Sequence, residues 1–132
     1  MLHAILGLVA GFVAAGASVF AAEMAGHALW PPPAGMDPMD PESIRANIHL
    51  VPLQAKIAVA AGWGLAALIG GLITMVVART SWPAWVIAAL LLAGALYNLY
   101  FIPSPVWMWV AGIAIIPIGA CAATKLVRPP AR

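Results

Sequence analysis

The sequence predicts an all-α polytopic membrane protein: four transmembrane helices in an antiparallel bundle, with a short amphipathic surface helix in the first loop. Apolar residues make up 64% of the 132 residues and charged residues only 8%, whereas roughly a quarter of the residues of a soluble domain are charged. The mean hydropathy is +1.02, and long uncharged stretches recur, each able to cross about 30 Å of hydrocarbon. We therefore expect residues 1–132 to form a single transmembrane domain.

The spans are expected at about residues 2–29, 53–78, 83–102 and 106–127. The first must end near Trp30, because the three prolines that follow cannot continue a helix. The connections between the second, third and fourth spans are only a few residues long, so consecutive helices must be antiparallel and in contact.

Residues 30–52 form the one substantial loop. Its proline-rich start is expected to be extended, since proline fixes its own backbone and restricts the residue before it. Asp40 then has the features of an N-cap, with Pro41 at the first helical position. Apolar residues recur at helical spacing through Ile44, Ile48 and Val51. The pattern predicts an amphipathic helix over residues 41–51, lying on the outer membrane surface.

The positions of the cations predict the orientation. Four spans place both termini on one side, and the cations on that side are Arg79, Lys125, Arg128 and Arg132. The other side has two cations, Arg45 and Lys56, against three acids. The positive-inside rule then predicts a multi-pass inner-membrane protein with both termini in the cytoplasm. Because the cations lie beside helix ends, the net charge of +2 needs no nucleic-acid partner to explain it.

Small residues repeat every four positions in the first two spans. Gly7 and Gly11 belong to this stripe in the first span, and Gly62, Ala66 and Gly70 belong to it in the second. Small residues at i and i+4 let helix backbones approach closely in lipid. The stripes are either an intramolecular contact, which is the commoner use, or a dimerisation face.

A polar cluster is expected beneath the outer loop, formed by Glu23, His27, Lys56, Asn98 and Tyr97. An acid in hydrocarbon costs several kcal/mol unless it is paired, protonated or buried in the bundle. A structural interpretation pairs Glu23 with Lys56, or bonds it to His27 and Asn98. A transport interpretation makes Glu23 a protonatable or cation-binding site.

A metal interpretation is weaker. Glu23 and His27 at i and i+4 would supply two ligands, with His49, Asp37 or Asp40 completing the site. The sequence has no dense His/Cys cluster, and Cys121 is its single cysteine. We therefore expect no bound metal or other cofactor. The absence of an acid pair in the spans, a Ser/His/Asp set, a phosphate-binding glycine loop and a CxxC motif predicts that the protein is not an enzyme.

The first half of the chain resembles uncharacterised small four-span membrane proteins of bacteria. The resemblance is carried by Glu23 and His27, then Pro31 to Pro33, then Gly35, Asp37 and Pro38, and finally Gly70 and Gly71. It implies the four-span topology and no activity.

The leading functional hypothesis is a small non-enzymatic membrane protein that acts through helix packing, as a homo-oligomer or as an accessory or assembly subunit. Its expected partners are the lipid bilayer and either copies of itself or other membrane subunits. The alternative is an oligomeric carrier or channel for protons, cations or a small solute, using Glu23.

Overall fold

The computed structural model describes residues 1–128, so Arg132, one of the cations used for the orientation, lies outside the described residues. In chain order the elements are α1 (Leu2–Leu29), α2 (Pro41–Asn47), the 3₁₀ helix η1 (Ile48–Leu50), α3 (Leu53–Ala78), α4 (Trp82–Phe101) and α5 (Val106–Leu126). Helices α1, α3, α4 and α5 are each long and apolar enough to span a membrane, and they pack against one another. The predicted all-α membrane bundle is confirmed, and its four apolar helices imply contact with lipid.

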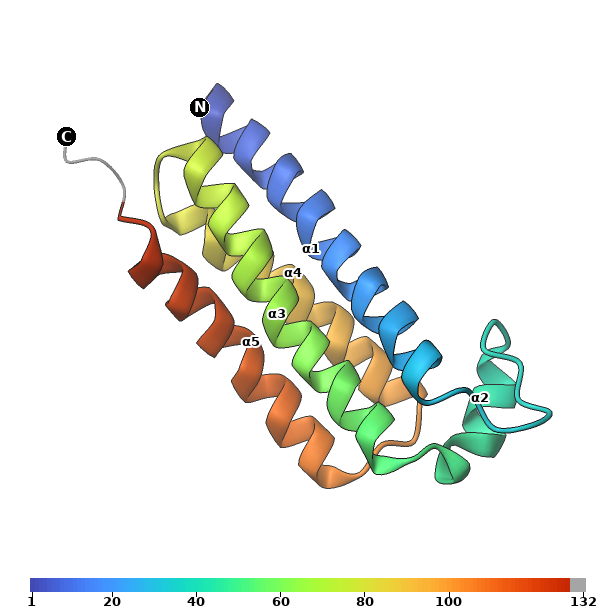
Figure 1. Ribbon diagram of the computed structural model, residues 1–132. Helices are drawn as coiled ribbons and strands as arrows, with labels where there is room; N and C mark the ends of the chain where they lie inside the picture. Colours follow the sequence, from blue (N-terminus) through green and yellow to red (C-terminus); the bar gives the residue numbers. More distant parts are fainter. Residues whose placement is uncertain (129–132) are drawn as a thin grey trace.

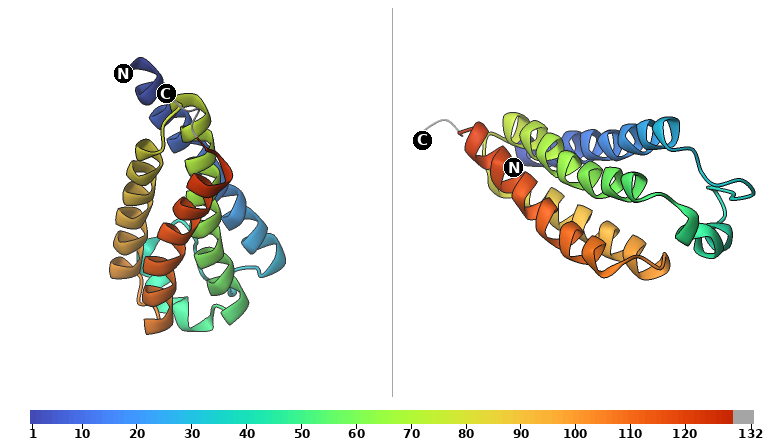
Figure 2. Two further views of the ribbon diagram at one scale, coloured as in Figure 1. Left: turned by 90° about the vertical axis from the view of Figure 1, so that its left-hand side faces the viewer. Right: turned by 60° about the horizontal axis from the view of Figure 1, so that its bottom comes forward.

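Helix α3 is central and contacts each of the other three long helices. Figure 1 shows α1 and α5 on its two flanks and α4 behind it. The N-terminus and the last turn of α5 lie at one end of the bundle, here called the terminal end. Residues 30–52, including α2, project from the opposite end, here called the loop end (Figures 1 and 2).

Helices α1 and α3 meet almost backbone to backbone. A methyl group added at Gly70 would lie 2.8 Å from the Ala15 Cβ and 3.0 Å from the carbonyl oxygen of Gly11. One added at Gly7 would lie 2.7 Å from the Thr74 carbonyl oxygen. Farther along the contact, a methyl group at Gly62 would lie 2.8 Å from the Ala22 Cβ, and Ala66 is fully buried. The small-residue stripe therefore joins two helices of one chain.

A second close contact joins α3 to α5. A methyl group at Gly71 would lie 2.9 Å from the Ala123 Cβ. The ring of Trp63 fills a notch at Gly112, where an added Cβ would come within 2.9 Å of it. Helix α5 continues through Pro117 without a break. These contacts make α3 the structural axis of the bundle.

The surface helix is shorter than predicted. It ends at Asn47 and tightens into η1 over Ile48–Leu50, whereas a single helix was expected over residues 41–51. The cause is Pro52, which disfavours helical backbone at the residue before it, and Val51 is accordingly extended (φ −71°, ψ 126°). Asp40 caps the helix as its type predicts, its carboxylate accepting from the Glu42 N–H at 3.0 Å. The four long helices begin and end within one residue of the expected spans.

Candidate binding chamber at the loop end

A cavity of about 220 Å³ lies where α1, α3 and α4 approach the loop. We call it the loop-end chamber. Its walls are mainly apolar, and its roof comes from the proline segment and from residues of α2 and η1. The polar side chains in its lining are Glu23, His27, Lys56, Asn98 and Ser104. Four of the five residues expected to form the polar cluster thus line one chamber.

Hydrogen bonds within the loop and one to α4 hold the roof of the chamber in place. The Arg45 Nε donates to the Phe101 carbonyl oxygen at 2.7 Å, which fastens α2 to the end of α4. The Asp37 N–H donates to the Ser43 Oγ at 2.8 Å, and the Met39 N–H to the Asp37 Oδ1 at 2.9 Å. Three consecutive prolines restrict the chain that leads from α1 into this roof. The roof is therefore an ordered cap, built by local turns and one long-range bond.

The polar residues of the chamber lie on three helices. Glu23 and His27 are one turn apart on the same face of α1. Lys56 lies in the first turn of α3 and Asn98 near the end of α4. Over residues 1–128, no hydrogen bond or ion pair joins any of these four side chains to another residue. Neither form of the structural interpretation, the pairing of Glu23 with Lys56 or its hydrogen bonds to His27 and Asn98, is therefore present among these residues.

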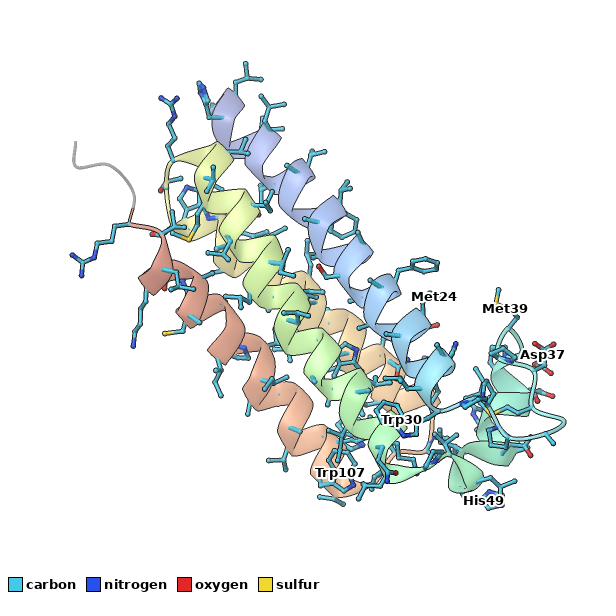
Figure 3. All side chains as sticks on the ribbon, in the orientation of Figure 1. Met24, Trp30, Asp37, Met39, His49 and Trp107 are labelled. Carbon is cyan, nitrogen blue, oxygen red and sulfur yellow. The ribbon has the colours of Figure 1, made fainter. Side chains whose placement is uncertain are left out.

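Four predicted candidates are not among the residues that line the chamber: Tyr97, His49, Asp37 and Asp40. Tyr97 is 67% exposed, and its ring lies 4.5 Å from the ring of Phe101 instead of facing Asn98. His49 belongs to η1 and points away from the bundle (Figure 3). In the described part of the chain no three His, Cys, Asp or Glu side chains gather closely enough to hold a metal ion. The metal interpretation of Glu23 and His27 therefore lacks a third ligand.

A second cavity, of about 380 Å³, runs between α1 and α4. We call it the membrane groove. Its lining is apolar along most of its length, with Phe12, Phe20 and Leu90 on its walls. Gly16 and Gly94 also line it, and a Cβ at either glycine would meet nothing within 4 Å. Unlike the glycines of the α1–α3 contact, these two face open space.

The chamber and the groove share two residues, Glu23 from α1 and Asn98 from α4.

The length of α1 sets the depth of Glu23 in the membrane. Helix α1 has 28 residues and is about 42 Å long, so a centred helix extends about 6 Å beyond a 30 Å hydrocarbon core at each end. Glu23 lies about 9 Å from the end of α1 and thus about 3 Å inside the hydrocarbon. Figure 3 shows Trp30 and Trp107 at the loop end, the position expected of interfacial tryptophans.

Sequence reasoning placed the polar residues at a common depth but missed the groove. Gly16 lies outside the four-residue stripe that contains Gly7 and Gly11. The sequence does contain a pattern for the α4 wall of the groove, because Leu90, Gly94 and Asn98 follow one another at four-residue steps and therefore lie on one face of α4.

Comparison of the chain with models of protein families, with curated proteins and with solved structures gave no match. The resemblance to small bacterial four-span proteins therefore rests on this chain's own residues, and a bacterial source is not supported.

Proposed function

We propose that this integral membrane protein is a non-enzymatic binding protein that holds a small zwitterionic molecule, or a zwitterionic head group, in the loop-end chamber. One observation carries the proposal: Glu23 and Lys56, which have opposite formal charges, line the same chamber without pairing. Unpaired ionic groups near hydrocarbon cost several kcal/mol. A ligand with an ammonium group near Glu23 and an anionic group near Lys56 would satisfy both.

The other chamber residues support this assignment. Asn98 can accept from an ammonium group beside Glu23, and His27 can donate to an anionic group. The volume of about 220 Å³ is below the 300–1,000 Å³ of sites for drug-sized ligands, so it suits a small solute or a head group. Glu23 is the single acid among the described lining residues, which supports binding over acid–base catalysis by a carboxylate pair.

The packing of the bundle supports binding over passage through one chain. At Gly11, Gly70 and Gly71 the gaps between α1, α3 and α5 are too narrow for an added methyl group. A carrier or channel that uses Glu23 would therefore need a path outside these contacts. We further propose that the loop end faces the outside of an inner membrane, because Arg79, Lys125 and Arg128 lie toward the terminal end.

The proposal is tested by calorimetric titration of the protein with phosphoethanolamine, a soluble zwitterion, in nanodiscs of phosphatidylglycerol, which contain no zwitterionic lipid. Glu23→Gln and Lys56→Gln should each weaken binding by at least tenfold, since a hydrogen bond to a charged group contributes about 1.5–3 kcal/mol. Glu42→Gln and Lys125→Gln change the same residue types away from the chamber and should leave binding unchanged. Failure of the unmodified protein to bind, or equal binding by all four variants, would refute the proposal.

A second candidate is the assembly function predicted from the sequence, as a homo-oligomer or an accessory subunit. Two observations favour it. Only 17% of the residues in the most apolar 18-residue segment of α1 are buried, against 50% in that of α3, and Gly16 and Gly94 face open space. Small residues with open space before them allow another helix to approach. Since Gly7, Gly11, Gly62 and Gly70 are used inside the chain, an interface would use this other face. Native mass spectrometry of the protein and of Gly16→Leu tests it, because leucine at this position should lower the oligomeric mass.

A further inference from the structure

We infer that the ligand of this protein is a zwitterionic membrane lipid, with its head group in the loop-end chamber and one acyl chain in the membrane groove. The inference rests on the proposed function and deepens it by naming the class of ligand. Its starting point is that Glu23 and Asn98 line both cavities. They lie on α1 and α4 where the two cavities meet, a place that we call the junction. A molecule that extends from one cavity into the other therefore passes between these two residues.

The groove has the chemistry and the length of a site for an acyl chain. Its walls are apolar from Phe12 to Phe20 on α1 and at Leu90 on α4. The distance along α1 from Phe12 to Glu23 is about 16 Å by helical rise, close to the 15 Å thickness of one hydrocarbon leaflet. Gly16 and Gly94 leave open space midway along it. A chain lying in the groove would therefore belong to a lipid of the leaflet at the loop end.

The junction places the polar groups where such a lipid changes from chain to head. Glu23 lies about 3 Å inside the hydrocarbon boundary of a centred helix. Lys56 lies in the first turn of α3, about 4.5 Å from its start, whereas Glu23 lies about 9 Å from the end of α1, so Lys56 is the nearer of the two to the loop end. A phosphodiester could bind Lys56 and His27 while an attached ammonium group binds Glu23 and Asn98. Charge complementarity therefore favours a head group with both charges over a purely anionic one.

A lipid also explains both cavities with a single occupant. A transmembrane helix with its side chains is about 10–12 Å across, wider than the space between two helices that contact each other as α1 and α4 do. It would enter the groove only with side chains, and the chamber beneath the cap would remain without an occupant. An acyl chain can enter whole, with its head group continuing into the chamber.

The test compares three probes on the delipidated protein in detergent, by native mass spectrometry and by calorimetric titration. They are phosphatidylethanolamine, phosphatidylglycerol with the same chains, and phosphoethanolamine without chains. We expect phosphatidylethanolamine to bind at least tenfold more tightly than either other probe. Glu23→Gln should remove the preference between the two lipids, whereas Glu42→Gln should preserve it.

A groove variant separates this inference from the proposed function. Gly16→Leu, with Gly94→Leu as a second variant, should weaken lipid binding at least tenfold and leave phosphoethanolamine binding unchanged, with unchanged thermal unfolding as the folding control. If phosphoethanolamine binds as tightly as the lipid, the lipid inference is wrong and the proposed function stands; if no probe binds, both are wrong. If the groove variants lose oligomeric mass while keeping the lipid, the groove holds a second copy and the inference is overturned.

Discussion

Replacing Gly70 by alanine should destabilise the bundle, whereas the same replacement at Gly16 should stabilise it. Both glycines lie inside long helices, where alanine is favoured over glycine by about 1 kcal/mol. At Gly16 nothing lies within 4 Å of the new methyl group, so the helix preference acts alone. We expect the free energy of unfolding of Gly16→Ala to rise by about 0.5–1 kcal/mol.

At Gly70 the new methyl group would lie 2.8 Å from the Ala15 Cβ, 3.0 Å from the Gly11 carbonyl oxygen and 3.2 Å from the side chain of Ile87. Ordinary contact begins near 3.4 Å, so α1 and α3 must separate by about 0.6 Å. Overpacking of this kind costs about 1–3 kcal/mol, which exceeds the gain in helix preference. The net loss should be up to about 2 kcal/mol, and the two variants should differ by about 1–3 kcal/mol, because the helix preference is common to both.

The assay is reversible unfolding by SDS in mixed micelles, followed by far-UV circular dichroism. A double variant, Gly11→Ala with Gly70→Ala, adds a check, because each new methyl group meets the other residue's carbonyl oxygen. Once the first has separated the helices, the second should cost less, so the combined loss should fall short of the additive value by about 1 kcal/mol. Equal effects of Gly70→Ala and Gly16→Ala would show that α1 does not pack on α3 as described.

Further predictions concern three polar residues. Within residues 1–128 the fully buried Thr74 hydroxyl has no hydrogen-bond partner, so Thr74→Val should leave the free energy of unfolding unchanged or raise it by about 1 kcal/mol. A loss in the same SDS titration would reveal a partner for the hydroxyl. Arg79 ends α3 in the left-handed conformation (φ 57°), so Arg79→Gly should stabilise the bundle by about 1 kcal/mol, while Arg128→Gly should have no such effect. Arg45→Gln removes the hydrogen bond from α2 to the Phe101 carbonyl oxygen. Amide hydrogen exchange over residues 41–50 should become at least tenfold faster, while α3 stays protected. Unchanged exchange would mean that this bond does not hold the cap.

The sequence predicted the long helices well because their limits are set by local constraints. Prolines end α1 and restrict the residues around them, and the required length of apolar chain follows from the thickness of the bilayer. The cap at Asp40 was predictable for the same reason, since its bond to the Glu42 N–H spans two residues. The last four residues of the predicted surface helix, 48–51, were assigned incorrectly to the α-helix, because the helical spacing of apolar residues was given more weight than Pro52.

The polar cluster was predicted only in part. The sequence shows the depth of each residue in the membrane, but whether two residues meet also depends on the direction in which their side chains point from the helix. Tyr97 and Asn98 are neighbours and lie at the same depth, yet adjacent helical residues point about 100° apart. The sequence grouped both with Glu23, whereas only Asn98 lines the chamber. A pairing of Glu23 with Lys56 was similarly one interpretation of their depths and charges, although the two side chains line one chamber without forming an ion pair.

Hydropathy, segment length and proline act on each segment separately, so they identify a membrane protein with four helical spans before any contact between the helices is known. Which glycines are used inside the chain and which face open space depends on how each helix is rotated against its neighbours, so this is visible only in the folded bundle. The same rotations place Glu23 and Asn98, 75 positions apart in the chain, at the junction of two cavities. No local pattern contains that information, since the cavities exist only between helices.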